Sequence, residues 1–341
     1  MRKKRVIVLF VIFFLIISYF AGGIIASNIV LSNIFEKRGS NESDLLTNEL
    51  LIYKTRNDYS IMNERIEYDF YSSNNKLKGY YYRVNDSKGL VISAHGMKSL
   101  SDAKDAEYQS YFIEQGYSVF AIDLTASGKS EGKSMNGLYQ SAYDIKAAYD
   151  FLKEGNMLED KLILVGHSWG AYGACASIAL GLNPDYVISF SAFDNPYDTM
   201  VRFSLNSVGG IIYPTIPTFY LATNIKYGKN NTLSASKALK NSKAKALVIQ
   251  GKNDKTVPYN KEALYNHVKN LSNVKTLLLD NIGHNNPWLS YDSIKYVEDE
   301  IEPKLASLSG SELDNFIKNV DKEKTSALSN IVFDEIKEFL K

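Results

Sequence analysis

The sequence predicts an α/β fold with a mostly parallel central sheet and helices on both faces. Short, continuous apolar runs recur along the chain, and this is the pattern of strands buried on both faces. Segments with helical periodicity separate these runs, which is typical of parallel strands joined by crossover helices. Two alternating, aromatic-rich segments precede the first apolar run and indicate an opening antiparallel hairpin.

The strands and helices follow in order over residues 62–341, which we expect to form one domain. The hairpin is RIEYDFYS and KLKGYYYRV, separated by the turn residues SSNN. Six buried strands are predicted next: GLVISAH, YSVFAIDL, KLILVG, DYVISFSAF, ALVIQG and KTLLLDN. Helices are predicted for SDAKDAEYQSYFIEQG, for residues 137–154, for the small residues after Ser168 and for the amphipathic IVFDEIKEFL.

Residues 1–35 predict a transmembrane anchor or a signal peptide. Residues 2–5 are all basic, and no charged residue then appears until Glu36. This uncharged stretch exceeds both the ~20 residues that span a bilayer and the ~7–15 of a signal-peptide core. Because basic residues stay in the cytoplasm, we expect a single-pass helix with a cytoplasmic N-terminus and an extracellular domain. The alternative is a protein secreted after cleavage near Ala21.

Three further segments stand outside the alternation of strands and helices. Residues 36–61 are polar and charged, and we expect a stalk that lifts the domain off the membrane. Residues 192–243 separate two strands by more than one crossover needs, and connections this long tend to be functional lids. Residues 289–330 predict a charged helical insertion to which the sequence assigns no role.

The composition argues against several classes of protein. A net charge of +1 with 23% charged residues fits neither a disordered chain nor a basic nucleic-acid binder. None of the four histidines has the spacing of zinc ligands, and no metal or organic cofactor is implied. Cys175 is the only cysteine, so no internal disulfide can form, and its helical spacing among small residues predicts a buried helix residue. Gly128-Lys129-Ser130 lacks the first glycine of a phosphate loop.

The pentapeptide Gly166-His167-Ser168-Trp169-Gly170 follows a predicted strand and precedes a predicted helix. This is the context of the G-x-S-x-G nucleophile elbow, a tight turn that presents a serine at the carboxyl end of a sheet. The strained turn requires small neighbours, which the two glycines provide. The sequence therefore predicts Ser168 as a nucleophile.

A nucleophilic serine needs a base, and His284 is the candidate because it directly follows the last predicted strand. His267 lies within a helical segment and is expected at the surface. His95 ends an earlier strand, and His167 is expected to point elsewhere on the elbow. With His284 as the base, the chain order serine, acid, histidine is fulfilled.

The base needs a carboxylate to hold its tautomer and to stabilise the imidazolium. Asp254 lies in the turn GKNDKTVP after the fifth buried strand and is the favoured acid. Asp194 follows the preceding strand and is the rival, although it opens the lid segment.

An acyl-transfer site also needs two donors for the oxyanion. One is expected from the backbone amide of Trp169, the residue after the nucleophile. The other is expected from the Met97 amide, in the loop after the GLVISA strand, where Gly96 lets the backbone approach the substrate. His95 is then expected to brace this loop.

Together these residues resemble the α/β-hydrolase superfamily, and most closely its exported or membrane-attached bacterial members grouped with serine aminopeptidases and monoacylglycerol lipases. The resemblance covers residues 64–341 and implies the α/β-hydrolase fold with a helical lid. The family's D-x-R-G-x-G-x-S loop is matched by Asp123, Gly128 and Ser130, whereas Thr125 and Ala126 replace its arginine and first glycine. The motifs that carry the resemblance are His95-Gly96-Met97, Gly166 to Gly170, Asp254 in GKNDKTVP, and Gly283-His284.

We therefore expect a serine hydrolase that cleaves carboxylic esters through an acyl-serine intermediate, outside the cytoplasmic membrane. The expected substrate is a small ester or acyl compound with an apolar group, because the lid is rich in Ile, Phe and Tyr. Peptidase or amidase activity, or acyl transfer to another acceptor, are the alternatives on the same triad. A binding module with little turnover is the alternative from another functional class, because a fold alone does not establish function.

Overall fold

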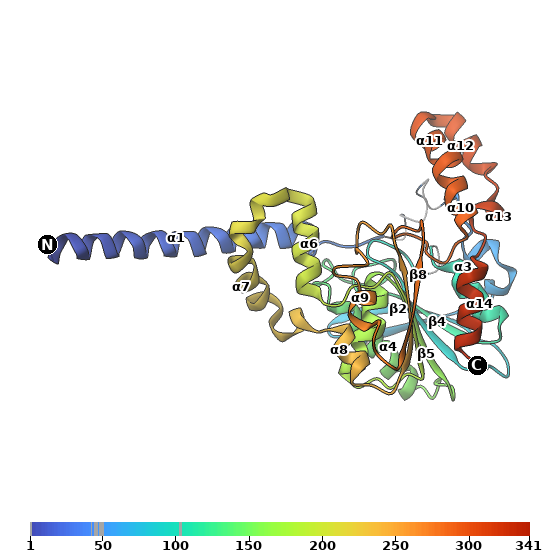
Figure 1. Ribbon diagram of the computed structural model, residues 1–341. Helices are drawn as coiled ribbons and strands as arrows, with labels where there is room; N and C mark the ends of the chain where they lie inside the picture. The colour runs from blue at the N-terminus through green and yellow to red at the C-terminus, as the bar shows by residue number, and fades with distance from the viewer. Residues whose placement is uncertain (1, 42, 44–46, 48–50, 102–103) are drawn as a thin grey trace.

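An eight-stranded sheet forms the centre of the protein (Figure 1). The computed structural model describes residues 2–41, 43, 47, 51–101 and 104–341. The strand order is β1-β2-β4-β3-β5-β6-β7-β8, in which β2 pairs antiparallel with β1 and β4 and all other pairs are parallel. The predicted parallel sheet with an opening hairpin is confirmed. Its strands are β1 (Ile66–Ser72), β2 (Asn75–Tyr82), β3 (Leu90–Ala94), β4 (Ser118–Asp123), β5 (Leu162–His167), β6 (Tyr186–Phe190), β7 (Lys245–Gly251) and β8 (Val274–Leu279).

The continuous apolar runs are strands that contribute to two cores, one on each face of the sheet. In β3, Leu90 and Ile92 belong to one apolar cluster and Val91 to the other. In β5, Leu164 faces the first cluster and Ile163 the second. Side chains alternate across a strand, so a strand covered on both faces must be apolar at every position.

Helices cover both faces of the sheet, as predicted (Figure 1). The first face carries α4 (Gln140–Glu154), α5 (Trp169–Ala176), α8 (Ala235–Lys240) and α9 (Leu264–Val268). The second carries α3 (Ala106–Glu114) and α14 (Asn330–Phe339). A short 3₁₀ turn, η4 (Ser177–Leu180), follows α5.

The long connection between β6 and β7 is helical. It contains α6 (Pro196–Val208), η5 (Gly209–Thr215), α7 (Ile216–Tyr227) and η6 (Gly228–Thr232) before α8. In Figure 1 these yellow elements lie at the end of the domain from which the N-terminal helix projects. The lid segment therefore adjoins the predicted membrane anchor.

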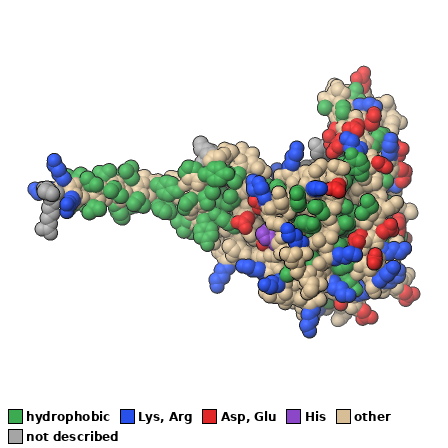
Figure 2. Space-filling view, in the orientation of Figure 1, with side chains coloured by type: hydrophobic (Ala, Val, Ile, Leu, Met, Phe, Trp, Pro, Cys, Tyr) green, Lys and Arg blue, Asp and Glu red, His purple; other side chains and the backbone are tan. Residues whose placement is uncertain are grey.

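The predicted N-terminal helix is present as α1 (Arg2–Ile34). Its stretch Lys3–Ile34 is long and apolar enough to cross a membrane, with a mean hydropathy of 2.7. The first half extends away from the domain with exposed apolar side chains (Figure 2), whereas Leu31 and Phe35 at its end are fully buried. The helix is therefore anchored in the domain at one end.

The described part of residues 36–61 packs on the domain, whereas a stalk that lifts the domain off the membrane was expected. Arg38 donates hydrogen bonds to the carbonyls of Gly128 at 2.5 Å and of Ser130 and Gly132 at 3.0 Å. Ile52 is buried, and Thr325 donates to its carbonyl at 2.6 Å. Two 3₁₀ turns, η2 (Arg56–Asp58) and η3 (Ser60–Met62), lead into β1.

The charged insertion forms a separate helical group beside the sheet. It consists of α10 (Tyr291–Tyr296), the π-turn η7 (Val297–Ile301), α11 (Glu302–Ser307), α12 (Gly310–Lys318) and α13 (Lys322–Thr325). Its own small core joins Val297 and Ile301 to Ile52. In Figure 1 this group projects beyond the sheet, at the upper right.

Candidate active site

Ser168 lies in a sharp turn between β5 and α5, with a φ of 51° that L-residues rarely adopt. Positions 166 and 170 must be glycine because there is no room for a Cβ atom at either one. A Cβ on Gly170 would lie 2.1 Å from the carbonyl oxygen of Ala94, and a Cβ on Gly166 would lie 2.5 Å from the carbonyl carbon of Gly170. The elbow therefore has the strained geometry and the close packing that the pentapeptide predicts.

Three predicted side chains meet at the carboxyl edge of the sheet. The Nε2 atom of His284 lies 2.9 Å from the hydroxyl oxygen of Ser168, and its Nδ1 atom lies 2.7 Å from Oδ2 of Asp254. A carboxylate only accepts hydrogen bonds, so Nδ1 carries a proton and donates. In the neutral ring Nε2 is then free to accept from the serine hydroxyl. The chain positions are far apart, and the strand ends bring them together.

The carboxylate of Asp254 is fixed by its own turn. Its Oδ1 atom accepts from the amides of Thr256 at 2.9 Å and Val257 at 2.7 Å. Its Oδ2 atom also accepts from the side-chain amide of Gln250 at 2.8 Å. The side chain is fully buried. These donors fix the position of the carboxylate and orient Oδ2 toward His284.

Asp194, the rival acid, serves another purpose. Its Oδ1 atom accepts from the Ser234 hydroxyl at 3.0 Å and from the Ser236 amide at 2.7 Å. These donors lie at the start of α8, where a carboxylate is favourable for the helix. The structure thus brings Asp254, and not Asp194, to the histidine.

The other histidines have separate positions. His95 is buried; it accepts from the Leu124 amide through Nε2 at 3.1 Å, and its Nδ1 donates to the Gly96 carbonyl at 2.7 Å. Burial lowers the pKa of this ring, which is therefore a neutral brace between two loops. His267 is exposed, as its helical pattern indicates.

His167 is the site residue whose role the sequence did not reveal. Its Nε2 donates to the backbone carbonyl of His284 at 2.9 Å, and its ring packs edge-on against Trp288. Burial lowers the pKa of His167 well below its usual value, so the ring stays neutral. Only its place beside Ser168 in the pentapeptide could have drawn attention to it.

The loop after β3 lies against the elbow. A Cβ on Gly96 would lie 2.8 Å from Nδ1 of His167, so this position also requires glycine. Among the described residues, no backbone carbonyl accepts from the amide of Met97 or of Trp169. These are the two predicted oxyanion donors.

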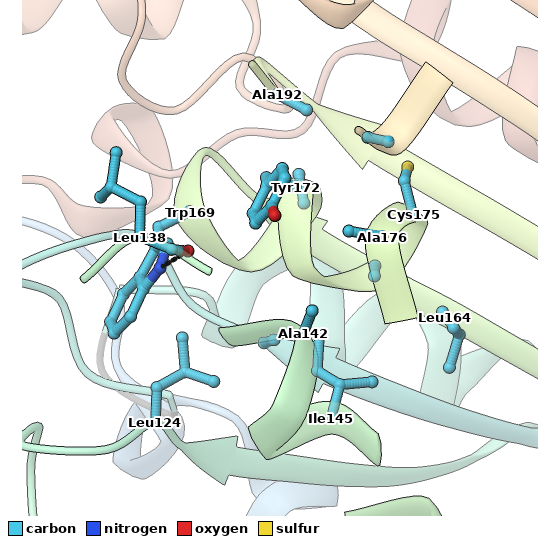
Figure 3. Close-up of a cluster of buried hydrophobic side chains, with 14 of the residues drawn as sticks. Leu124, Leu138, Ala142, Ile145, Leu164, Trp169, Tyr172, Cys175, Ala176 and Ala192 are labelled. Carbon is cyan, nitrogen blue, oxygen red and sulfur yellow. Dashed lines mark hydrogen bonds between the residues drawn. The ribbon is translucent and has the colours of Figure 1, made fainter. Parts of the chain in front are cut away.

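The helix that follows Ser168 is buried along its whole length and packs through Trp169, Tyr172 and small side chains (Figure 3). The Trp169 indole donates to the carbonyl of Leu138 at 2.7 Å, and the Ser141 hydroxyl donates to the carbonyl of Trp169 at 2.8 Å. Cys175, near the end of this helix, is buried, and burial raises the pKa of its thiol to about 12. It is therefore an apolar packing residue and not a nucleophile.

The loop that departs from the family pattern is held by Arg38. Ala126, which stands where the family has glycine, adopts a φ of 60°. Thr125, which stands where the family has arginine, binds the buried carboxylate of Asp144 through its amide and hydroxyl. The guanidinium of Arg38 reaches the carbonyls of this loop from the segment after α1. An arginine from elsewhere in the chain thus binds this loop.

A cavity of about 650 Å³ opens beside His284. It lies between the catalytic loop and the helical insertion, not beneath the lid segment. Over the part of the chain that the structure describes, no group of His, Cys, Asp or Glu side chains could hold a metal ion. The lining residues that the structure gives are Ile52, Tyr53, Lys104, Gly283, His284, Asn285, Asn286, Ile294, Val297, Glu298, Glu302, Leu305 and Ala306.

Comparisons with known sequences agree with this architecture. A family model described as "Serine aminopeptidase, S33" matches residues 85–234, a range that includes Met97 and the elbow but ends before Asp254 and His284. An uncharacterized protein of Rickettsia prowazekii (strain Madrid E) is 25% identical over 136 residues, or 38% of this chain. The match spans 56% of that curated relative, just over half its length.

Solved structures share the fold over most of their length. An esterase of Pyrococcus furiosus, 20% identical, has a TM-score of 0.51 over 76% of this chain and 92% of its own. Est1E of Butyrivibrio proteoclasticus with ferulic acid bound, 16% identical, also reaches 0.51, over 79% and 99% of the two chains. With the doubly covered sheet and the strained Ser168 elbow, these similarities lead to one conclusion: the chain has the α/β-hydrolase fold, and residues 85–234 match the serine aminopeptidase family model.

Proposed function

We propose that the protein is a serine hydrolase that cleaves carboxylic esters. The observation that carries this proposal is the pair of hydrogen bonds in series, from Ser168 to His284 at 2.9 Å and from His284 to Asp254 at 2.7 Å. A serine, an imidazole and a buried carboxylate in this order are what acyl transfer requires. The proposal goes beyond the family match, because the matched residues 85–234 include Ser168 but neither Asp254 nor His284.

In the first half of the proposed reaction, Nε2 of His284 takes the proton of the Ser168 hydroxyl as Oγ attacks the ester carbonyl. Asp254 remains ionised and stabilises the imidazolium, held in place by its two backbone donors. The tetrahedral intermediate collapses, the C–O bond to the alcohol breaks, and the alcohol leaves with the proton from Nε2. An acyl-serine remains.

In the second half, His284 takes a proton from water, and the hydroxide attacks the acyl-serine. Collapse of this intermediate releases the carboxylic acid and returns the proton to Oγ of Ser168. In both halves, the amides of Met97 and Trp169 would donate to the oxyanion. Their freedom from backbone partners among the described residues supports this assignment.

The cavity beside His284 suggests the chemistry of the substrate. Apolar side chains of Ile52, Ile294, Val297 and Leu305 line one part of it, beside the charged Lys104, Glu298 and Glu302. We assign the apolar part to an apolar acyl or aryl group of the ester. This assignment also gives a role to the insertion, which supplies one wall. The lid was the expected source of this pocket, but several of its apolar side chains are exposed on the outside of the domain.

The proposed location is the outer face of the cytoplasmic membrane. The length and mean hydropathy of α1 support an uncleaved anchor, and the basic residues before it support a cytoplasmic N-terminus. Secretion after cleavage is the alternative. It predicts a mature chain that lacks the part of α1 before about Ala21, which the intact mass of the native protein would reveal.

A substrate screen on the full chain tests the proposed reaction. Nitrophenyl esters of graded acyl length should be hydrolysed, and Ser168→Ala should abolish that turnover while remaining folded. Aminoacyl and peptide amides are included because the matching family model describes aminopeptidases. Faster cleavage of amides than of esters would replace the esterase by a peptidase, and turnover of neither would favour a binding module.

A further inference from the structure

We propose that the lid segment is a second membrane element, which lies in the lipid leaflet beside α1 on the side of the catalytic domain. The proposal rests on the proposed anchor, since α1 must remain uncleaved. The lipid-facing surface, here called the lid surface, consists of exposed apolar side chains. They are Val208, Tyr213, Tyr220, Leu221 and Ile225.

The lid packs directly against α1. A Cβ on Gly23 would lie 2.4 Å from Oγ1 of Thr218, so the two helices approach closely where α1 has a glycine. The Tyr19 hydroxyl donates to the carbonyl of Pro214. At the base of the lid, Phe35 stacks on Phe203 with 6.1 Å between ring centroids. Contact thus runs from the tip of the lid to its base.

The depth of these contacts follows from helix geometry. A hydrocarbon core of about 30 Å holds about 20 helical residues at about 1.5 Å each. If that core begins directly after Arg5, it ends near Ile25, so both Tyr19 and Gly23 lie inside it. A core placed later along α1 puts them deeper. The lid atoms that touch them therefore lie at hydrocarbon depth in either case.

The distribution of charge follows the same boundary. No charged residue occurs in residues 6–35 or in residues 203–225, which are the two segments in contact. Both uncharged segments end at ion pairs. Lys226 pairs with Glu36 at 3.1 Å, and Arg202 pairs with Glu262 at 2.9 Å. A segment exposed to lipid contains few charged residues, so these ion pairs mark the boundary between the lipid-exposed segments and the rest of the domain.

Three polar side chains of the lid donate to carbonyls three or four residues before them. Thr218 donates to the carbonyl of Thr215, and Thr223 and Asn224 both donate to the carbonyl of Tyr220. Helical backbone with internally bonded polar side chains suits a medium without water. In Figure 2 the apolar surface of α1 continues onto the neighbouring elements of the domain. Such a contiguous patch indicates a partner, and its continuity with α1 identifies that partner as lipid.

Site-specific labelling in a bilayer tests the proposal. The full chain is placed in phosphatidylcholine nanodiscs, and an environment-sensitive fluorophore is attached at Ile225→Cys or Tyr220→Cys. The natural Cys175 is buried and does not compete for the label. Matched controls lie elsewhere on the domain: Ile331 is 69% exposed against 71% for Ile225, and Tyr291 is 47% exposed against 50% for Tyr220.

Acyl-chain spin labels on the lipids should quench the fluorophore at Ile225→Cys and Tyr220→Cys several-fold more than at Ile331→Cys and Tyr291→Cys. Equal quenching at all four positions, or none at the two lid positions, would overturn the proposal. A blue shift at the lid without lipid quenching would also overturn it, in favour of a second copy of the chain. None of these readouts depends on catalysis, so failure of the proposed esterase reaction remains distinguishable.

Discussion

The imidazole of His167 donates a hydrogen bond from Nε2 to the backbone carbonyl of His284 at 2.9 Å. The residue before Ser168 thereby holds the loop that carries His284. The ring is buried beside Trp288, and burial keeps it neutral by lowering its pKa. The elbow and the histidine loop, which are far apart in the chain, are thus joined by one hydrogen bond next to the reacting atoms.

Loss of this bond should misplace the base. His167→Ala leaves a buried carbonyl without its donor, a cost of about 1–3 kcal/mol. If the loop moves to avoid this cost, His284 is displaced from Ser168. In that case kcat for a nitrophenyl ester drops about 10-fold or more while KM changes little. His167→Gln retains a donor and should recover part of kcat. A role confined to stability would instead lower the unfolding temperature of both variants and leave kcat of the folded enzyme unchanged.

The acid is tested by a matched pair of substitutions. Asp254→Asn removes the charge that holds the His284 tautomer and should reduce kcat by about 10⁴-fold, as in comparable triads. Asp194→Asn keeps an oxygen that accepts from Ser234 and Ser236, so its kcat should stay within a few-fold of wild type. The assignment is wrong if Asp194→Asn is the more damaging change in the same assay.

Because the elbow is closely packed, the addition of one methyl group at Gly170 should destabilise the fold. In Gly170→Ala the new Cβ would lie 2.1 Å from the Ala94 carbonyl oxygen, and the backbone on both sides must shift. We expect a loss of about 1–3 kcal/mol or more of unfolding free energy. Gly283→Ala is the control, because its Cβ would meet nothing within 4 Å. Thermal unfolding of both variants should separate them clearly; equal unfolding temperatures would contradict the close packing.

Two buried carboxyls near the start of α3 predict how stability depends on pH. Burial raises the pKa of Asp105 to about 7 and that of Glu107 to about 8. The unfolded chain releases these protons near pH 4, so the folded state binds more protons above that pH. Their stabilising contribution is therefore complete below about pH 4 and is lost as the pH rises through about 7 to 8.

The unfolding temperature should accordingly fall between about pH 5 and about pH 9, and Glu107→Gln should flatten that fall. Glu312→Gln, at an exposed position of α12, is the control and should keep the wild-type slope. A wild-type unfolding temperature that rises over the same range would show that these carboxyls are not protonated in the folded protein.

The sheet and the meeting of the site residues could be predicted because each rests on a local pattern. A strand buried on both faces is apolar along its length, so runs such as GLVISAH and KLILVG can be recognised as strands from the sequence. Parallel strands end at one edge, and the residues after those ends were therefore expected to meet. Ser168, Asp254 and His284 lie within hydrogen-bond distance for this reason.

The remaining features depend on contacts between distant segments, which leave no periodic signal. Arg38 reaches the loop around Gly128 across about ninety residues, so its polar segment was expected to be a stalk. The close approach of Gly23 to Thr218 likewise joins an anchor and a lid that seemed unrelated in the sequence. The position of the cavity beside the insertion depends on the packing of Ile52 against Val297, two residues in different segments.

Covalent labelling of the full chain with a fluorophosphonate tests the central claim most directly, because only an activated serine reacts with it at a useful rate. Mass spectrometry of the digested protein should find one adduct, on Ser168, with slow labelling in His284→Ala and none in Ser168→Ala. A folded wild-type protein that does not react, or a Ser168→Ala variant that is labelled equally, would contradict the account.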